Sequence, residues 1–187
     1  MKTLSNLVLG LAVLLGVVAW MADARAQTGS KKETGRANTV MQDVSPNELK
    51  ARLESWGYKV GAHEDRQERT ELLVSNDASR GVDEYKGFNM RMFGCTPEDA
   101  SFMERRCDGY EFRAFLRPGY PVKNKTYMDW NREFGQTRAF DTQGKPRLAW
   151  RVTIKGGVTW DNIRATVDLW EQELVAYFDH IDASVMD

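Results

Sequence analysis

Beyond the first 44 residues, hydrophobic and polar positions follow a helical period in three segments and a period of two in the segments between them. The first helical segment opens with Ser45-Pro46-Asn47-Glu48, which has the form of a capping box with proline at the first helical position. Leu49, Leu53 and Trp56 then fall on one face. We expect a helix here that ends before Gly57.

After this helix, alternation with a period of two predicts a series of strands. Short strands are expected over residues 58–62 and 71–75, and two more around residues 88–92 and 110–116. In the first strand Tyr58, Val60 and Ala62 alternate with Lys59 and Gly61. The later strands each carry an apolar stripe on one face, formed by Phe88, Met90 and Met92 and then by Tyr110, Phe112, Ala114 and Leu116.

A second helix and a hairpin are expected next. The helix spans residues 124–133, with Tyr127, Trp130 and Phe134 facing inward. Strands at residues 139–140 and 148–154 are then joined by a polar turn over residues 141–146.

The last predicted element is a long amphipathic helix that follows Gly156-Gly157, with Thr159 as its N-cap. Its expected inward stripe is Trp160, Ile163, Val167, Trp170, Leu174, Phe178 and Ile181. The complete order predicts an α+β fold, with a mostly antiparallel sheet packed by an N-terminal helix, a middle helix and this C-terminal helix.

The first 26 residues have the pattern of a secretory signal peptide. Lys2 precedes an uncharged apolar run from Leu7 to Met21, and Ala24-Arg25-Ala26 has the small-residue form that signal peptidase accepts. We expect cleavage after Ala26, a periplasmic or secreted protein, and no stable membrane span after cleavage. The alternative is an uncleaved signal anchor that tethers the protein to the membrane.

Residues 27–44 are polar and predict a flexible linker, which places the folded domain at residues 45–187. The whole chain of 187 residues is 42% hydrophobic and 28% charged, as is typical of an ordinary globular protein. Its 26 basic and 27 acidic residues include no overall basic excess, so we expect no nucleic-acid partner.

Cys95 and Cys107 are the only two cysteines, and in an exported protein such a pair predicts a structural disulfide. The loop that they enclose is polar and is expected to be exposed. The alternative is a reactive or metal-binding thiol pair, but neither His63 nor His180 lies at ligand spacing from the cysteines. We expect no metal and no cofactor.

Charge is distributed unevenly along the chain. Residues 104–155 carry 12 basic and 6 acidic side chains, whereas residues 161–187 carry 1 basic and 7 acidic ones. We therefore expect a basic sheet beside an acidic last helix.

Arginine and phenylalanine are interleaved on the strand positions that alternate with the core stripe, and this face is our candidate partner-binding surface. Such a face suits a protein partner, an acidic peptide or an anionic envelope polymer. The alternatives are an ordinary solvated sheet face and self-association with the acidic helix of a second copy. Reversing the charges of Arg113 and Arg151 is expected to weaken partner capture without lowering the melting temperature. The candidate residues are Arg91, Phe93, Arg113, Phe115, Arg117, Arg151 and Lys155, with Arg147 on the same face.

None of the common catalytic or nucleotide-binding motifs occurs in the sequence. His63 and His180 are both expected to be exposed, so no histidine base is expected beside a nucleophile. We therefore expect a non-catalytic protein. The alternative is a small-ligand sensor or an enzyme with a pocket near Gly156-Gly157, where amides at a helix start can bind an anion.

Several short motifs also recur in a fixed order along the chain. They are Gly57-Tyr58, Cys95 at a strand end, Trp130-Asn131 before Phe134, Asp141 with Gly144, Gly156-Gly157-Val158-Thr159, and Trp170. From about Ser45 to Ile181 the chain resembles the bacterial YbjN family of sensory transduction regulators. The loop between the cysteines looks longer than is usual in that family, and Arg151 stands where members often carry an acidic residue.

This resemblance implies a fold similar to that of type III secretion chaperones, which are compact modules that dimerise and hold extended client segments. It supplies no catalytic residues. Together with the motifs above, it predicts an exported binding, chaperone-like or regulatory module that acts through protein–protein contacts, with a partner protein or with itself as a homodimer.

Overall fold

The computed structural model describes residues 39–64, 70–75, 87–116 and 121–184. The expected signal peptide and most of the expected linker lie outside these ranges. None of the helices in the described ranges combines the length and the apolar character that crossing a bilayer requires. The helices are α2 (Pro46–Ser55), the short 3₁₀-helix η1 (Phe102–Glu104), α3 (Asn124–Glu133) and α4 (Trp160–Ala183). The strands are β1 (Lys59–Glu64), β2 (Thr70–Ser75), β3 (Phe88–Thr96), β4 (Arg106–Phe115), β5 (Arg138–Thr142) and β6 (Lys145–Thr153).

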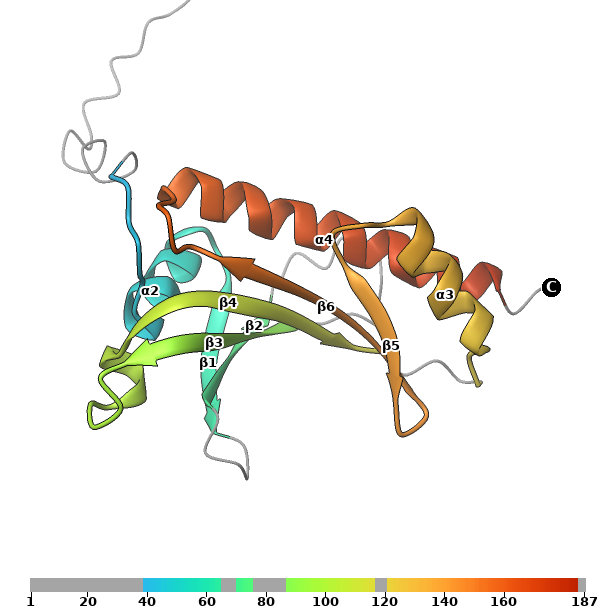
Figure 1. Ribbon diagram of the computed structural model, residues 1–187, viewed down its shortest axis with the longest axis horizontal. Coiled ribbons are helices and arrows are strands. Elements are labelled where there is room, and N and C mark those ends of the chain that lie inside the picture. The colour runs from blue at the N-terminus through green and yellow to red at the C-terminus, as the bar shows by residue number, and fades with distance from the viewer. Residues whose placement is uncertain (1–38, 65–69, 76–86, 117–120, 185–187) are drawn as a thin grey trace, which may run out of the picture. The chain divides into compact units, whose positions relative to one another are not determined.

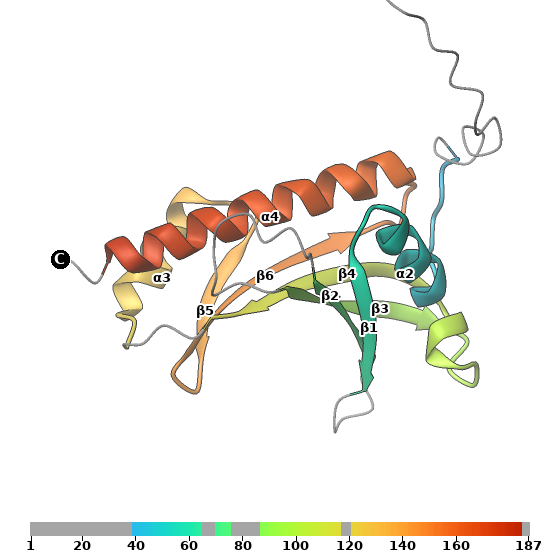
Figure 2. The ribbon, with the colours of Figure 1, turned by 180° about the vertical axis from the view of Figure 1, so that it is seen from behind.

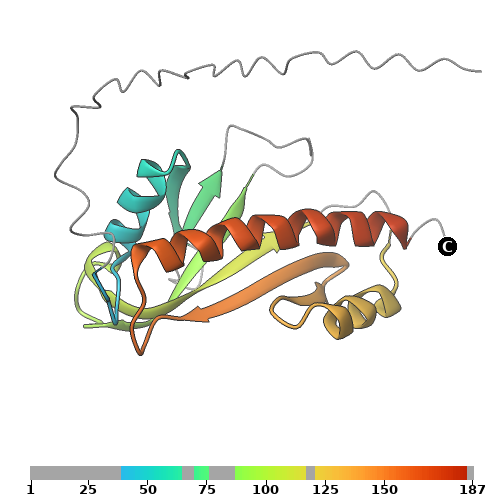
Figure 3. The same cartoon turned by 90° about the horizontal axis from the view of Figure 1, so that it is seen from above.

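The six strands form one antiparallel sheet in the order β1-β2-β3-β4-β6-β5 (Figure 1). The long helix α4 runs across this sheet, with α2 near one end of α4 and α3 near the other (Figure 3). The opposite face of the sheet carries none of the three α-helices (Figures 1 and 2). The predicted α+β class is therefore confirmed, in the form of a helical layer on one face of an open sheet.

The core lies between α4 and the helix-facing side chains of the central strands. Phe112 on β4 stacks on Trp170 of α4 with their ring centroids 5.1 Å apart, and both side chains are fully buried. Phe88 on β3 meets both rings edge-on, at 5.6 Å from Phe112 and 6.2 Å from Trp170. These contacts fix where the middle of α4 lies on the sheet, because large rings in a packed core leave few alternative arrangements.

Both predicted helix caps are confirmed, because each cap depends only on residues close in sequence. The Ser45 hydroxyl accepts a hydrogen bond from the Glu48 amide at 3.2 Å, and the Glu48 carboxylate accepts one from the Ser45 amide at 3.0 Å. Thr159 and Asn162 exchange the same pair of contacts at the start of α4, both at 3.2 Å.

One prediction about α4 is wrong. Tyr177 is fully buried on its inner face, whereas Phe178, which was expected there, is only half-buried. Tyr177 continues the stripe of Trp170, Leu174 and Ile181 at spacings of four, three and four, and its hydroxyl donates to the carbonyl of Arg147 at 3.4 Å. A tyrosine can occupy this inner position because its polar tip finds an acceptor at the end of the sheet.

The hairpin between β5 and β6 is tighter than the predicted six-residue turn. The strands pair as far as Thr142 and Lys145, so only Gln143 and Gly144 form the loop. Both have positive φ, 56° and 74° respectively, which is the backbone of a two-residue hairpin turn. The Asp141 side chain accepts the Gly144 amide at 2.9 Å, so the residues expected to lie in a loose turn continue the strands.

The predicted domain boundary at Ser45 is also corrected. Met41 exchanges two backbone hydrogen bonds with Val158, at 2.8 and 2.9 Å. Val44 exchanges two with Cys107, at 3.1 and 2.9 Å, and its side chain is fully buried. We call residues 41–44 the strap. This end of the expected linker is part of the folded domain.

Candidate functional site

One face of the sheet is turned away from α4 (Figure 2). The side chains that alternate with the core stripe lie on this face. We call it the open face. The strand registers place on it the predicted arginines and phenylalanines together with two glutamates that the sequence interpretation left out. We define it by Glu71 on β2, Arg91 and Phe93 on β3, Glu111, Arg113 and Phe115 on β4, Arg138 and Phe140 on β5, and Arg147 and Arg151 on β6.

Opposite charges alternate along one row of the open face. Glu71 pairs in register with Arg91, Arg91 with Glu111, and Glu111 with Arg151, across four neighbouring strands. Side chains that are directly opposite on neighbouring strands lie close enough to attract each other. The two glutamates therefore neutralise part of the positive charge that the sequence alone assigned to this face.

Arg113 serves the fold as well as the surface. Its guanidinium donates to one oxygen of the Glu71 carboxylate at 3.0 Å, and the side-chain amide of Asn89 donates to the other oxygen at 2.8 Å. Glu71 is 6% exposed, so its charge depends on these two donors. A second contact, at 3.5 Å, joins Arg113 to Glu111. From the sequence we expected that reversing the charge of Arg113 leaves the melting temperature unchanged. Its contacts with Glu71 and Glu111 predict instead that this change lowers the melting temperature.

Arg151 lies on an aromatic ring. Its guanidinium carbon is 4.0 Å from the centre of the Phe93 ring, in a cation–π contact that crosses β4 between β6 and β3. The Phe93 ring in turn covers Gly109, where an added Cβ would come within 2.4 Å of a ring carbon. Glycine at position 109 thus leaves the space that the Phe93 ring occupies beside β4.

Arg147 and Phe115 form a second stack of the same kind. The guanidinium carbon lies 4.3 Å from the ring centre, and the two residues are register partners on β6 and β4. Phe115 is 42% exposed. Burial of the Arg147 guanidinium, together with repulsion from nearby Arg113, holds its pKa below the ordinary value. Within the described ranges neither Arg147 nor Arg151 has a carboxylate partner in an ion pair.

The candidate residues do not all meet on this face. Arg91, Phe93, Arg113, Phe115 and Arg151 share it, as the alternation along the strands predicted. Lys155 lies beyond the end of β6, where its ammonium pairs at 3.4 Å with Asp108, a β4 residue that alternates with the open-face positions. Arg117 lies outside the described residues.

The predicted disulfide between Cys95 and Cys107 is present, and it joins residues that face each other in the β3–β4 register. It closes the hairpin that carries η1, at the same position where Val44 of the strap bonds to Cys107. A loop of this size contributes about 3 kcal/mol in the chain-entropy description. The disulfide and the strap therefore stabilise the same end of β4.

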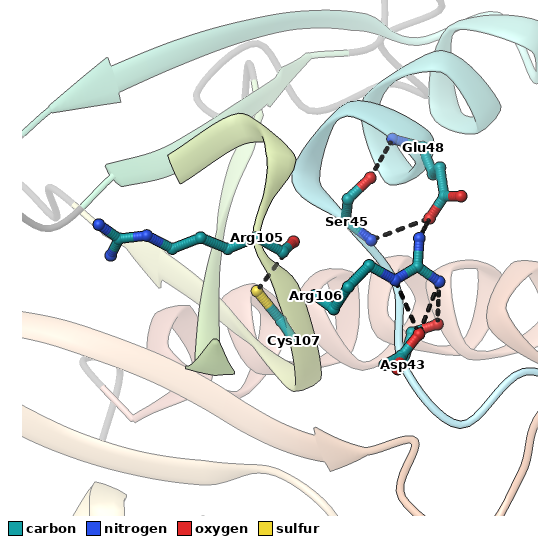
Figure 4. A network of polar contacts seen from close by, with 6 residues as sticks. All are labelled: Asp43, Ser45, Glu48, Arg105, Arg106 and Cys107. Carbon is teal, nitrogen blue, oxygen red and sulfur yellow. Dashed lines mark hydrogen bonds and ion pairs between the residues drawn. The ribbon is translucent and has the colours of Figure 1, made fainter. Parts of the chain in front are cut away.

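Arg106, next to the disulfide, joins the strap to the start of α2 (Figure 4). Its guanidinium donates twice to the Asp43 carboxylate, at 2.8 and 2.6 Å, and also to the carboxylate of Glu48. Partial burial raises the pKa of Glu48, but the hydrogen bonds from Arg106 and from the Ser45 amide outweigh burial and hold that pKa below its usual value. The capping box is thus linked to a residue 58 positions away.

The amides near Gly156-Gly157, which were the alternative site for an anion, are largely bonded within the protein. The Gly157 amide donates to Ile154 at 3.0 Å, and the Val158 amide donates to Met41 of the strap at 2.9 Å. At the start of α4 the amides of Thr159, Asn162 and Ile163 are also bonded. These amides therefore take part in the turn and in the helix cap.

The two histidines differ in their surroundings. His63 is exposed on β1, as expected. His180 is half-buried, contrary to expectation: its Nε2 lies 3.0 Å from the Thr126 carbonyl, and its ring meets Trp130 edge-on at 5.6 Å. The cause is the packing of α3 against the end of α4, which a helical-wheel pattern does not include. Across the part of the chain that the structure describes, no group of three or more histidine, cysteine or acidic side chains is placed to hold a metal ion.

Three of the motif residues near α3 have structural tasks. The Asn131 side chain donates to the Ala139 carbonyl at 2.8 Å and accepts the Ala139 amide at 2.7 Å, so it pairs with the edge of β5 as a short strand would. Trp130 donates from its indole N–H to Thr137 at 3.1 Å and stacks on Phe134. These contacts attach α3 to the sheet.

Comparisons of the chain with protein-family models, with curated proteins and with solved structures returned no match. The resemblance described above thus has no support beyond the motifs themselves.

We predict that Arg113→Gln lowers the free energy of unfolding by about 1–3 kcal/mol, because it leaves the buried Glu71 carboxylate without its charged donor. Arg151→Gln, on the same face, should change it by less than about 1 kcal/mol, because only an exposed cation–π contact is lost. Urea unfolding of the two variants measures both values. Equal losses would contradict the separate roles assigned to the two arginines.

Glu48→Gln should lower the free energy of unfolding by an amount that depends on pH. The pKa of Glu48 is lower in the folded protein than in the unfolded chain. The ionised carboxylate therefore stabilises the fold at any pH above the unfolded pKa. This stabilisation is lost as the pH falls through the folded pKa. The side chain is 48% exposed, so the loss at pH 7 should be below about 1 kcal/mol and should shrink toward pH 3. Glutamine preserves the capping box.

The matched control is Glu54→Gln, which makes the same charge change on α2 in a residue that pairs with Lys50 of its own helix. Denaturant titrations between pH 3 and pH 7 compare the two variants. A loss for Glu48→Gln that stays constant with pH, or that Glu54→Gln reproduces, would show that Arg106 does not stabilise the charged form of Glu48.

Proposed function

We propose that the protein is an exported, non-catalytic binding module of the YbjN type that holds a protein partner on its open face. The observation that carries the proposal is the pair of arginine–phenylalanine stacks. Arg147 on Phe115 and Arg151 on Phe93 present cations without carboxylate partners in the described ranges. An acidic segment of a protein is the partner whose chemistry matches them.

The geometry of the stacks favours binding over an incidental arrangement. An arginine held against a ring has lost part of its rotamer freedom before it meets a ligand, and its guanidinium can still donate to a carboxylate. The exposed ring of Phe115 and the 41% exposed side chain of Leu73 add apolar area to the same face. Rings, arginines and apolar side chains together are typical of the centre of a protein–protein interface.

The proposed location rests on the disulfide. A disulfide that closes a hairpin persists in an oxidising compartment and is rare in the cytosol. With the signal-like pattern of the first 26 residues, this supports a periplasmic or secreted protein. The alternative is the retained-anchor form, in which the expected linker ahead of the strap would tether the domain to the membrane.

The test is a partner-capture experiment with a double variant, Arg147→Gln with Arg151→Gln, that removes both positive charges. Partners recovered by crosslinking in cells with the unmodified protein should be lost or reduced at least about tenfold with this variant, because both stacked cations are removed. Melting temperatures are measured in parallel to show that the variant remains folded.

The matched control is Lys125→Gln with Arg132→Gln, which removes the same charge from α3, where both side chains are strongly exposed. This variant should retain its partners. Loss of partners with the α3 variant but not with the open-face variant would place the interaction surface on the helical layer instead.

A further inference from the structure

The two stacked arginines of the open face differ in their surroundings. Arg147 is half-buried, and its Nε is buried without a hydrogen-bond partner in the described part of the chain. Arg151 is exposed, and its register partner on β4 is Glu111. A half-buried charge attracts a counter-charge more strongly than an exposed one, because water and salt screen it less. Arg147 is therefore the stronger attachment point for a carboxylate.

A second guanidinium lies near Arg147. The guanidinium carbon of Arg147 is 4.3 Å from the centre of the Phe115 ring, and that of Arg113 is 5.9 Å from the same centre. Burial, and after it repulsion from Arg113, holds the pKa of Arg147 below its ordinary value. Arg113 has Glu71 and Glu111 as partners, whereas Arg147 has no carboxylate at ion-pair distance in the described ranges. One carboxylate from a ligand would offset the repulsion between the two arginines.

Aromatic rings flank this half-buried charge. Phe115 on β4 and Phe140 on β5 are the two register partners of Arg147, so the three side chains form one row across neighbouring strands. Phe115 is 42% exposed, and Phe140 is half-buried. Because the Arg147 guanidinium is stacked on Phe115, a carboxylate that reaches this guanidinium also lies beside an exposed ring. An apolar side chain next to that carboxylate would cover the ring.

We propose, on the basis of the function proposed above, that Arg147 and Phe115 form an anchor for an acidic residue that lies within two positions of a large apolar residue in the partner protein. The carboxylate pairs with the planar Arg147 guanidinium, which offers two parallel donors. The apolar side chain covers the exposed part of Phe115. Arg151, exposed beside Glu111, adds attraction for acidic segments and does not select the apolar neighbour.

The experiment uses fluorescent 12-residue peptides of identical composition and the purified protein with its disulfide intact, at low salt. Both peptides carry two aspartates and one phenylalanine in a glycine–serine background, with amidated C-termini. In one peptide the phenylalanine lies within two positions of each aspartate, and in its isomer it lies at the N-terminal end, away from both. Fluorescence anisotropy should show about tenfold tighter binding of the first peptide, because its phenylalanine is buried together with the ion pair.

Single variants locate the anchor. Arg147→Gln should remove the preference for the first peptide, and so should Phe115→Ala, which retains both stacked arginines. The matched control is Arg151→Gln, which makes the same charge change in the other stack and should keep the preference while weakening both peptides equally. Melting temperatures are measured in parallel. The Tyr177 hydroxyl bonds to the backbone carbonyl of Arg147, so replacing the arginine side chain leaves that contact in place.

The outcomes separate the anchor from the proposed function. If both isomers bind equally and both lose affinity in the Arg147→Gln/Arg151→Gln variant, the anchor is overturned while the open face stays the binding surface. A preference that persists in Arg147→Gln and disappears in Arg151→Gln also overturns it, because the other stack would then select the ligand. If neither isomer binds and the double variant still captures its partners in cells, both the anchor and the proposed function fail.

A second copy of the chain is the competing occupant, because exposed acidic residues such as Asp161 and Asp168 lie along α4. Sedimentation at low salt tests it in the absence of peptide. A mass that rises with concentration for the unmodified protein, but not for Arg147→Gln, would assign Arg147 to self-association and overturn the anchor for a partner protein. A constant monomer mass agrees with the anchor.

Discussion

The packing of α4 on the sheet is the interaction on which the rest of the structure depends. Trp170 stacks on Phe112 at the centre of this contact, and both are fully removed from water. The helical layer covers only one face of the sheet, so the other face has to be stabilised by contacts among side chains that remain beside water (Figures 1 and 2). The alternating charges, the Glu71–Arg113 pair and the two ring stacks meet this requirement.

The open face divides into a structural part and a part available to a partner. Arg113 is committed to Glu71, and Glu111 is shared between its neighbours in the register. Arg147 and Arg151 are instead supported from below by rings, which hold their positions without neutralising their charges. The binding proposal follows from this division, because the two stacked arginines have no carboxylate partner within the described ranges and are placed to attract an acidic segment.

The sequence predicted the elements well where their signals were local. The caps at Ser45 and Thr159 lie within one helical turn, and the alternation on β3, β4 and β6 identified most of the open face. What it could not predict depends on contacts between distant residues. Glu71 stands in an apolar run, and its partner Arg113 is 42 positions away. The strap residues lack a periodic pattern, and they join the fold through Cys107 and Val158.

The most direct test of the central claim is site-specific photocrosslinking in cells. A photoreactive residue replaces Phe115 on the open face or, as the comparison, Asp168 on the outer side of α4, and mass spectrometry identifies the crosslinked peptides. The account predicts adducts from position 115 with acidic segments of a partner protein, and few from position 168. Adducts that form from position 168 and not from position 115 would contradict it, because the partner would then bind the helical layer and not the open face.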